Sequence, residues 1–217
     1  MSNNLIKTIA RVGYAPITSD SESGYTYGDI GYFESGEAGG REISATAEGE
    51  TIEIYADGKA VISGEDNNGY TIDLTLLSDI DDIEKDWLGN TVDSAGVHET
   101  ADTDVRPRFA LVAAKELLKG EKEYQVDIFY NCQVTQRPDI KAKTKEKSFD
   151  PLFPTYKIAA RPRTDNKWIR STIYCDELPT TIPTPPTESG TSQSSSSSSG
   201  SGSNSGGSGS GSSSGQG

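Results

Sequence analysis

The sequence contains little of the chemistry that supports disulfide scaffolds, zinc sites or imidazole catalysis. Its 217 residues include two cysteines, Cys132 and Cys175, which lie far apart and form no CxxC pair. This spacing argues against a disulfide framework and against a zinc site made of thiolates. The single histidine, His98, lies in the polar stretch DSAGVHETADTD, which favours a surface loop over a role as general base.

Positive charge and long apolar runs are also scarce. Lys and Arg number 20 against 33 Asp and Glu, so the formal net charge is −13. A protein that binds nucleic acid by neutralising phosphates needs a clustered basic face, so this balance argues against specific DNA or RNA binding. The most apolar window, FALVAA at 109–114, is too short for a membrane span or a signal-peptide core.

The C-terminal stretch lacks the side chains that a folded core requires. From Thr181 onward the only large apolar residue is Ile182 and the only charge is Glu188. Such a segment cannot bury enough apolar surface to offset its ordering entropy. We therefore predict one folded domain over residues 1–178 and a disordered Pro/Ser/Gly-rich tail over 179–217. The tail is either a flexible linker without an outer domain or a solubilising fringe.

Alternating apolar and polar residues dominate the part that remains. This pattern, with its Thr, Ile and Tyr content, predicts half-buried strands at 51–55, 70–77, 108–113, 123–131, 155–160 and 168–174. Between the first two strands, Asp57-Gly58 and Asn67-Asn68-Gly69 favour positive φ, which predicts a long hairpin or a protruding loop. A turn at 120–122 is expected to join the strands on either side of it.

One helix is predicted in the middle of the chain. Ile80, Ile83, Trp87 and Leu88 fall on one stripe of a 3.6-residue helix, with aspartates in its first turn. We expect Ser78 and Asp81 to form a capping box there. The predicted fold class is α+β, mainly β, with two packed antiparallel sheets in a sandwich or barrel and one flanking α-helix.

No arrangement of residues indicates catalysis or a cofactor. The acidic run at 78–84 lacks the spacing of a calcium loop, and neither GxxxxGK[ST] nor GxGxxG occurs. Helix capping explains the acidic run better than a metal site does, and packing explains the two cysteines. We therefore expect a protein that is not an enzyme and that has no cofactor and no catalytic or metal-binding residue.

Positive charge gathers in one place, at Lys141, Lys143, Lys145 and Lys147. On a strand these lysines would share one face and form a basic ridge. Such a ridge suits contact with an acidic surface of another subunit, and a solvated strand or loop is an equally good interpretation.

Several segments, taken together, resemble the major tail proteins (tail tube proteins) of long non-contractile phage tails that infect Gram-positive hosts. In chain order, the segments that carry the resemblance are VGYAPIT at 12–18, YTYGDI at 25–30, IEIYADGKA at 52–60, NNGYTIDLTL at 67–76, DWLGNTVDSAGV at 86–97, RFALVAA at 108–114, IFYNCQVTQRP at 128–138, KTKEK at 143–147 and IAARPRTD at 158–165. The ordered series, rather than any single motif, is what makes the resemblance specific. It covers about residues 5–175, and the Ser/Gly tail departs from it.

The resemblance implies a structural virion protein with a tail-tube-like fold. Its subunits would form homohexameric rings that stack around a tape-measure protein, end at tail terminator and distal tail proteins, and conduct DNA during genome ejection without binding it specifically. Inner sheets would join into a continuous barrel, and an extended loop would bridge rings. The candidate loops are 56–69 and 139–154, because both are long connections between strands. Candidate contact residues within them are Asp57, Lys59, Asp66, Asn67, Lys141, Lys143, Lys145 and Lys147. The expected location is the phage tail, after assembly in the host cytoplasm.

Two other function classes remain open at this point. A carbohydrate-binding or adhesive β-sandwich on a flexible Ser/Gly stalk fits the composition, although the sequence shows no export signal. A hydrolase on a β scaffold would need a carboxylate pair, and 33 acidic residues make any such pair uninformative.

Overall fold

The computed structural model describes residues 4–21, 24–49, 51–56, 59–99, 106–141, 144 and 151–183. The chain divides into a compact unit, Met1–Pro185, and a second unit, Pro186–Gly217, which lies outside the described residues. The strands of the compact unit are β1 (Leu5–Ser21), β2 (Gly24–Tyr27), β3 (Gly31–Tyr32), β4 (Gly40–Glu48), β5 (Thr51–Ala56), β6 (Lys59–Glu65), β7 (Gly69–Leu76), β8 (Thr91–Asp93), β9 (Gly96–His98), β10 (Phe109–Lys119), β11 (Tyr124–Gln136), β12 (Thr155–Ala160) and β13 (Arg170–Cys175). The single described helix is α1 (Asp81–Asp86).

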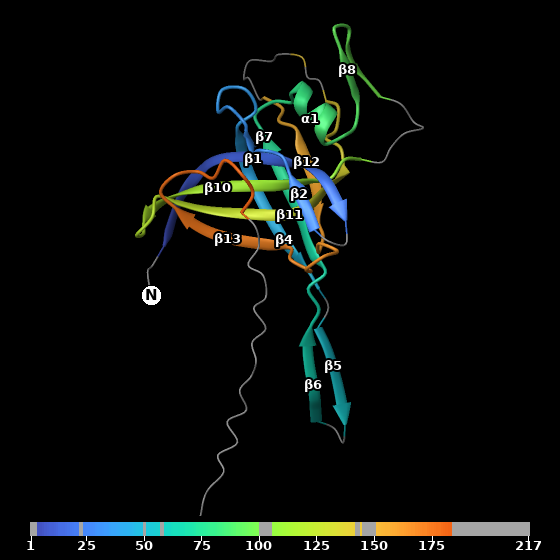
Figure 1. The fold of residues 1–217 in the computed structure, drawn as a ribbon, viewed down its shortest axis with the longest axis vertical. Helices are drawn as coiled ribbons and strands as arrows, with labels where there is room; N and C mark the ends of the chain where they lie inside the picture. Colours follow the sequence, from blue (N-terminus) through green and yellow to red (C-terminus); the bar gives the residue numbers. More distant parts are fainter. Residues whose placement is uncertain are drawn as a thin grey trace, which may run out of the picture. The chain divides into compact units, whose positions relative to one another are not determined.

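Nine strands form one antiparallel sheet in the order β2-β1-β10-β11-β12-β7-β4, with β13 paired to β11 and β3 paired to β1. The long strand β11 connects two layers of this sheet. Its first half pairs with β13 and its second half with β12, while β10 lies along its other side. Figure 1 shows β10, β11 and β13 crossing steeply over β4, β7 and β12. The mainly β fold class, with packed antiparallel layers and one flanking helix, is thus confirmed.

The main core lies between the two layers. β7 and β12 contribute Ile72, Leu74, Leu76, Tyr156 and Ile158, and strand alternation places these side chains on one face. β1, β10 and β11 contribute the opposing residues Val12, Phe109, Leu111, Phe129 and Cys132. The register between β10 and β11 shifts between Phe109 and Leu111, so Phe129 and Cys132 both reach this core although three positions separate them.

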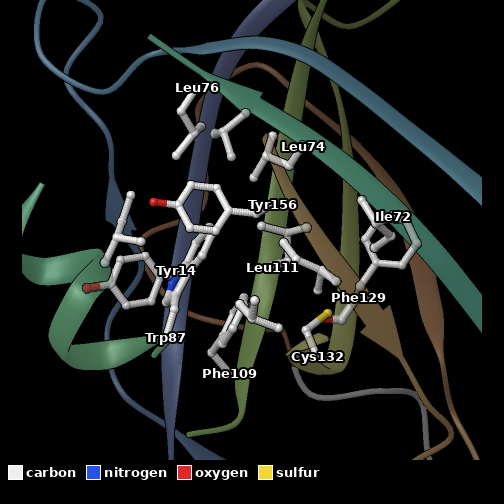
Figure 2. Packing of buried hydrophobic residues seen from close by; sticks show 14 of the residues in the cluster. Tyr14, Ile72, Leu74, Leu76, Trp87, Phe109, Leu111, Phe129, Cys132 and Tyr156 are labelled. Atoms are coloured by element: carbon white, nitrogen blue, oxygen red, sulfur yellow. The ribbon is translucent and has the colours of Figure 1, made fainter. Parts of the chain in front are cut away.

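Helix α1 closes the core at one end through aromatic contacts (Figure 2). The indole of Trp87, directly after the helix, is fully buried. Its ring meets Tyr14 and Tyr156 edge-on, with centroids 5.6 Å away in both cases. The Tyr14 hydroxyl donates to Asp86 at 2.6 Å, and the Tyr156 hydroxyl donates to Asp79 at 2.5 Å. One tyrosine from each layer therefore holds one end of the helical segment.

The helix prediction is partly corrected. Ile83, Trp87 and Leu88 are buried as the stripe predicts, and Gly89 ends the segment at φ 76°. The predicted capping box is wrong, because the residue before the helix is Ile80 and no side chain caps it. The Ser78 hydroxyl instead donates to the carbonyl of Glu37.

A second core covers the opposite face of the β1-β10-β11-β13 layer. Alternate residues of β10 and β11, among them Val112 and Ile128, are buried there. The chain that follows β13 lies over them, with Leu178 and Ile182 packed against this core. The Ile30 amide donates to the Thr180 carbonyl at 2.8 Å. Packed structure thus continues beyond residue 178, where the sequence places the start of the tail.

Candidate assembly surfaces

The outer face of the β4-β7-β12 layer is polar, and no described segment of the chain covers it. Its residues alternate along each strand with the residues that face the core. They form three rows across β4, β7 and β12, which are Glu42-Thr75-Thr155, Ser44-Asp73-Lys157 and Thr46-Thr71-Ala159. All of these except Ala159 are exposed or half-buried. We call this set the polar face. It contrasts with the outer face of the other layer, which the second core and the C-terminal segment cover.

Hydroxyls and charged groups on the polar face bond to one another across the strands. The hydroxyls of Thr75 and Thr155 lie 2.9 Å apart. At the end of β4, Glu48 accepts hydrogen bonds from Thr71 and Arg161. The Thr71 hydroxyl and the Arg161 guanidinium together lower the pKa of the Glu48 carboxyl. The face therefore carries fixed charge and bound hydroxyls but no apolar side chain larger than alanine.

This layer ends at an open sheet edge. Within the described part of the chain, β4 pairs only with β7, so the backbone groups on the other side of its nine residues are unpaired. The interior of β4, from Ile43 to Ala47, contains neither a charge nor a proline. Charges, prolines and bulges are the usual means of preventing edge-to-edge association. The β4 edge is therefore available for pairing with another chain.

β5 and β6 form a separate two-stranded ribbon that continues the β4-β7 hairpin (Figure 1). The sequence predicts a long hairpin or protruding loop at 56–69, and the structure corrects its bounds, because 51–56 pairs with 59–65 and so forms half of the hairpin. Its junction with β4 and β7 is tight, since the Asn68 amide donates to the Glu48 carbonyl at 2.8 Å. A Cβ on Gly49 would lie 2.0 Å from the Asp66 carbonyl oxygen. Only glycine fits at that position.

The candidate contact residues of this hairpin lie along the ribbon and at its base. Lys59 begins β6, and Asp57 lies outside the described residues. Asp66 and Asn67 are exposed at the base. The Asn67 side-chain oxygen accepts from the Gly69 amide at 3.3 Å.

The basic stretch is described only in part. Lys141 is exposed and forms an ion pair with Asp139 at 2.8 Å, which lowers the pKa of that carboxyl. Residues 137–141 and 144 belong to no strand. Lys143, Lys145 and Lys147 lie outside the described residues, so a shared face for the four lysines stays a prediction. The structure does not bring Lys141 together with the ribbon residues, because they lie at opposite ends of β7.

A groove of about 610 Å³ beside Lys141 was not predicted from the sequence. It lies at the end of β7 and the start of β12, and its lining includes Leu77, Arg137, Ile140 and Leu152. Ile140 is fully exposed, and Leu77 and Leu152 are each 38% exposed. The Arg137 guanidinium pairs with Glu99 through Nη1, while its buried Nε and Nη2 have no partner within the described chain. The lining comes from three segments, so no sequence motif marks it.

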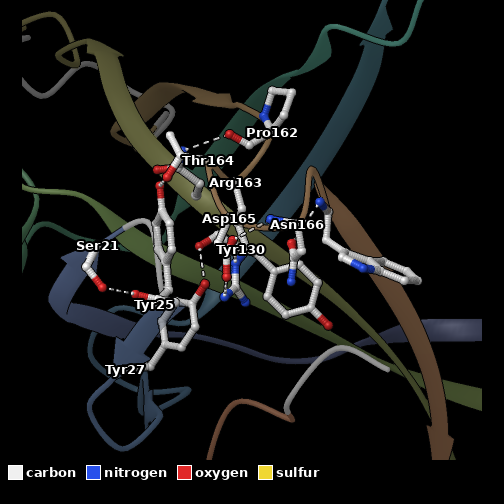
Figure 3. A network of polar contacts seen from close by, with 12 residues as sticks. Ser21, Tyr25, Tyr27, Tyr130, Pro162, Arg163, Thr164, Asp165 and Asn166 are labelled. Carbon is white, nitrogen blue, oxygen red and sulfur yellow. Dashed lines mark hydrogen bonds and ion pairs between the residues drawn. The ribbon is translucent and has the colours of Figure 1, made fainter. Parts of the chain in front are cut away.

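Sequence reasoning also missed a buried arginine. Figure 3 shows Arg163 among Tyr25, Tyr27 and Tyr130, with its guanidinium 4.8 Å from the Tyr25 ring centre. The Asp165 carboxylate accepts two hydrogen bonds from it, at 2.9 and 2.5 Å. Burial alone would raise the pKa of Asp165, but the guanidinium holds it below its usual value. Because the guanidinium is paired with a carboxylate through Nε and Nη2 and its charge lies against aromatic rings, we interpret the cluster as structural.

No group of three or more His, Cys, Asp or Glu side chains within the described residues could hold a metal ion. His98 is exposed and contacts Asp93 at 3.2 Å. Both cysteines are free, and burial raises the pKa of the Cys132 thiol to about 12. No helix in the described part of the chain is long and apolar enough to cross a membrane.

Comparisons with known proteins give no further information about these surfaces. No model of a known protein family matches the chain, and no curated protein matches it either.

Proposed function

We propose that this protein is the major tail tube subunit of a siphophage-like virion. It would form stacked hexameric rings around a tape-measure protein and serve as the conduit for DNA ejection, without catalytic activity. The ordered sequence resemblance to tail tube proteins supports this function. The mainly β fold with a flanking helix is the architecture that the resemblance implies.

The observation that carries the proposal is the polar face together with the open β4 edge. A sheet face that stays in water and ends in an edge strand whose interior, residues 43–47, carries no charge or proline suits the inner wall of a channel built by joining copies edge to edge. Within the described residues nothing covers this outer face, whereas Leu178 and Ile182 pack against the other. The polar face is therefore assigned to the lumen and the β4 edge to contact between neighbours in a ring.

The charge of this face fits the passage of DNA. On the face and at its ends, Glu42, Asp73 and Glu48 are balanced by Arg41, Lys157 and Arg161. A strongly basic wall would bind the phosphates and slow the passage of DNA, since duplex DNA carries one negative charge per about 1.7 Å of its axis. A hydroxyl-rich wall without a basic excess would not hold DNA in this way, and its charges would act only within the Debye length of about 8 Å at physiological salt.

Sedimentation velocity over a wide concentration range tests this proposal. The tail tube function predicts species of six copies or multiples of six, which grow with concentration. A monomer at every concentration contradicts it and favours a β-sandwich binding module, which a glycan-binding screen then tests.

A further inference from the structure

A small pocket lies between β2 and the C-terminal segment, on the face of the sheet that carries the second core. Residues 25–28, residues 181–183 and Arg163 line a volume of about 240 Å³. We infer that this pocket binds a single ring of a neutral sugar. The inference does not rest on the tail tube function. In the proposed tube the pocket would open on the outside, because the polar face of the other layer is assigned to the lumen.

The walls of the pocket are held in place by contacts within the chain. Tyr25 and Tyr27 lie on one face of β2, with ring centroids 6.3 Å apart and ring planes inclined by 29°. The Tyr27 hydroxyl donates to the Tyr130 carbonyl at 3.0 Å. An antiparallel bridge between Asp29 and Thr181 holds the C-terminal wall. A ligand would therefore enter a preformed site and would not have to order it.

Arg163, which Figure 3 shows beside Tyr25 and Tyr27, brings a polar group to the pocket wall. Its side chain is only 4% exposed. Asp165 accepts hydrogen bonds from Nε and Nη2, so neither bond uses Nη1. A sugar hydroxyl can accept from Nη1, and the hydroxyl of the exposed Thr181 can donate to or accept from another. The pocket therefore suits a ligand that carries several hydroxyl groups.

The charge of the pocket favours a neutral ligand. Among the described residues that line it, Arg163 is the only one with a charged side chain, and Asp165 already pairs with that charge. An anion would have to compete with Asp165 for the guanidinium, and a cation would meet no lining carboxylate. A purely apolar ligand would cover Nη1 without giving it an acceptor, which is unfavourable.

Apolar surface beside these polar groups fits the two-sided chemistry of a sugar ring. Tyr27, Ile182 and Pro183 are half-buried and line the pocket. A pyranose ring has C–H groups on its faces, which pack against such surface, and hydroxyls at its edge. The volume is below the roughly 300–1,000 Å³ of sites for drug-sized ligands, so we expect one ring and not a longer chain. For so small a ligand we expect a Kd on the order of 1 mM.

Saturation-transfer-difference NMR on the full chain tests the inference, since this method detects binding to a monomer and to a large assembly alike. The probes are glucose, galactose and N-acetylglucosamine, with glucuronate and glucosamine as charged sugars. At least one neutral sugar should give a saturable signal with a Kd on the order of 1 mM, and the charged sugars should bind more weakly. The methyl glycoside of that sugar then distinguishes two sources of the ligand, and both support the inference. Equal binding indicates the end of a glycan, and binding of the free sugar alone indicates a free monosaccharide.

Filling the pocket should remove this signal. Thr181 is exposed and lines the pocket, so T181W should place an indole there without disturbing the core. The matched control is T180W, because Thr180 is also exposed but is not among the residues that line the pocket. T180W should bind the sugar as the wild type does. P183W is a second filling variant, and an unchanged melting temperature shows that each variant is folded.

Four results would overturn the inference. They are a wild-type protein that binds no neutral sugar well above the expected Kd, binding that survives in folded T181W and P183W, an equal loss of binding in T180W, and tighter binding of glucuronate or glucosamine. None of these results concerns ring formation, which sedimentation velocity measures separately. A monomer that binds sugar would support the inference and contradict the tail tube function.

Discussion

The indole ring of Trp87 stacks on the ring of Phe109, with centroids 4.6 Å apart and planes inclined by 7°. This pair joins the helical segment to the central strand β10. Both side chains are fully buried. The stacking therefore fixes where α1 lies on the sandwich.

Replacing Trp87 by alanine should destabilise the fold by about 3–5 kcal/mol, because it leaves a large cavity at this junction. Chemical denaturation followed by circular dichroism measures the loss. Trp168, which is only partly buried, provides the control. W168F should cost clearly less, and equal losses for the two variants would contradict the central position of Trp87.

Gly69 should be the least replaceable glycine of the hairpin junction. Its φ is 128°, and an added Cβ would lie 2.1 Å from the Ala160 carbonyl oxygen. Gly96 has a similar φ of 133° but nothing within 4 Å of an added Cβ. G96A should therefore cost only the backbone strain of about 1–3 kcal/mol, and G69A should cost more. Thermal unfolding of both variants measures the difference, which a smaller loss for G69A would contradict.

The ion pair between Arg163 and Asp165 predicts a loss of stability in acid. The folded state lowers the pKa of Asp165 below its unfolded value of about 3.9. The contribution of Asp165 to the free energy of unfolding is therefore fully present above about pH 3.9, and it is lost as the pH falls through the lowered pKa. The D165N variant should be less stable at neutral pH and should lose less stability in acid than the wild type. D176N, at an exposed ion pair with Lys122, should change the pH profile little. Identical acid profiles for D165N and wild type would show that this pair does not contribute.

A lysine on the open edge should prevent lateral assembly without unfolding the subunit. Thr46 is exposed at the centre of β4, and charged edge residues disfavour strand addition. T46K should keep the melting temperature of the wild type and shift the sedimentation profile to monomers. E121K, at the exposed turn between β10 and β11, adds the same residue elsewhere and should assemble normally. Normal ring assembly by T46K would show that β4 does not form the subunit interface.

The sequence predicts those strands whose core residues alternate without interruption. Strand 155–160 is found at the predicted bounds, the strand predicted at 51–55 is one residue longer, and the strand predicted at 70–77 is shifted by one residue to 69–76. β1 was not predicted, because three register shifts against β10 break its alternation. β4 was missed because its small and polar residues leave only Ile43 as a strong apolar signal.

The candidate surfaces were less accessible to sequence reasoning. Local turn signals at 57–58 and 67–69 predict a protruding hairpin or loop there, but they do not reveal that strand 51–56 belongs to the hairpin. The groove depends on Leu77, Arg137 and Leu152, which only the pairing of β7, β11 and β12 brings together. The bare polar face depends on knowing that the C-terminal segment covers the other layer. That segment contains too few apolar residues to reveal this from sequence alone.

Self-assembly is the central claim, and negative-stain electron microscopy of the concentrated, purified protein tests it most directly. The account predicts six-fold rings with a central channel, or long tubes made of such rings. Uniform small particles at every concentration would contradict it.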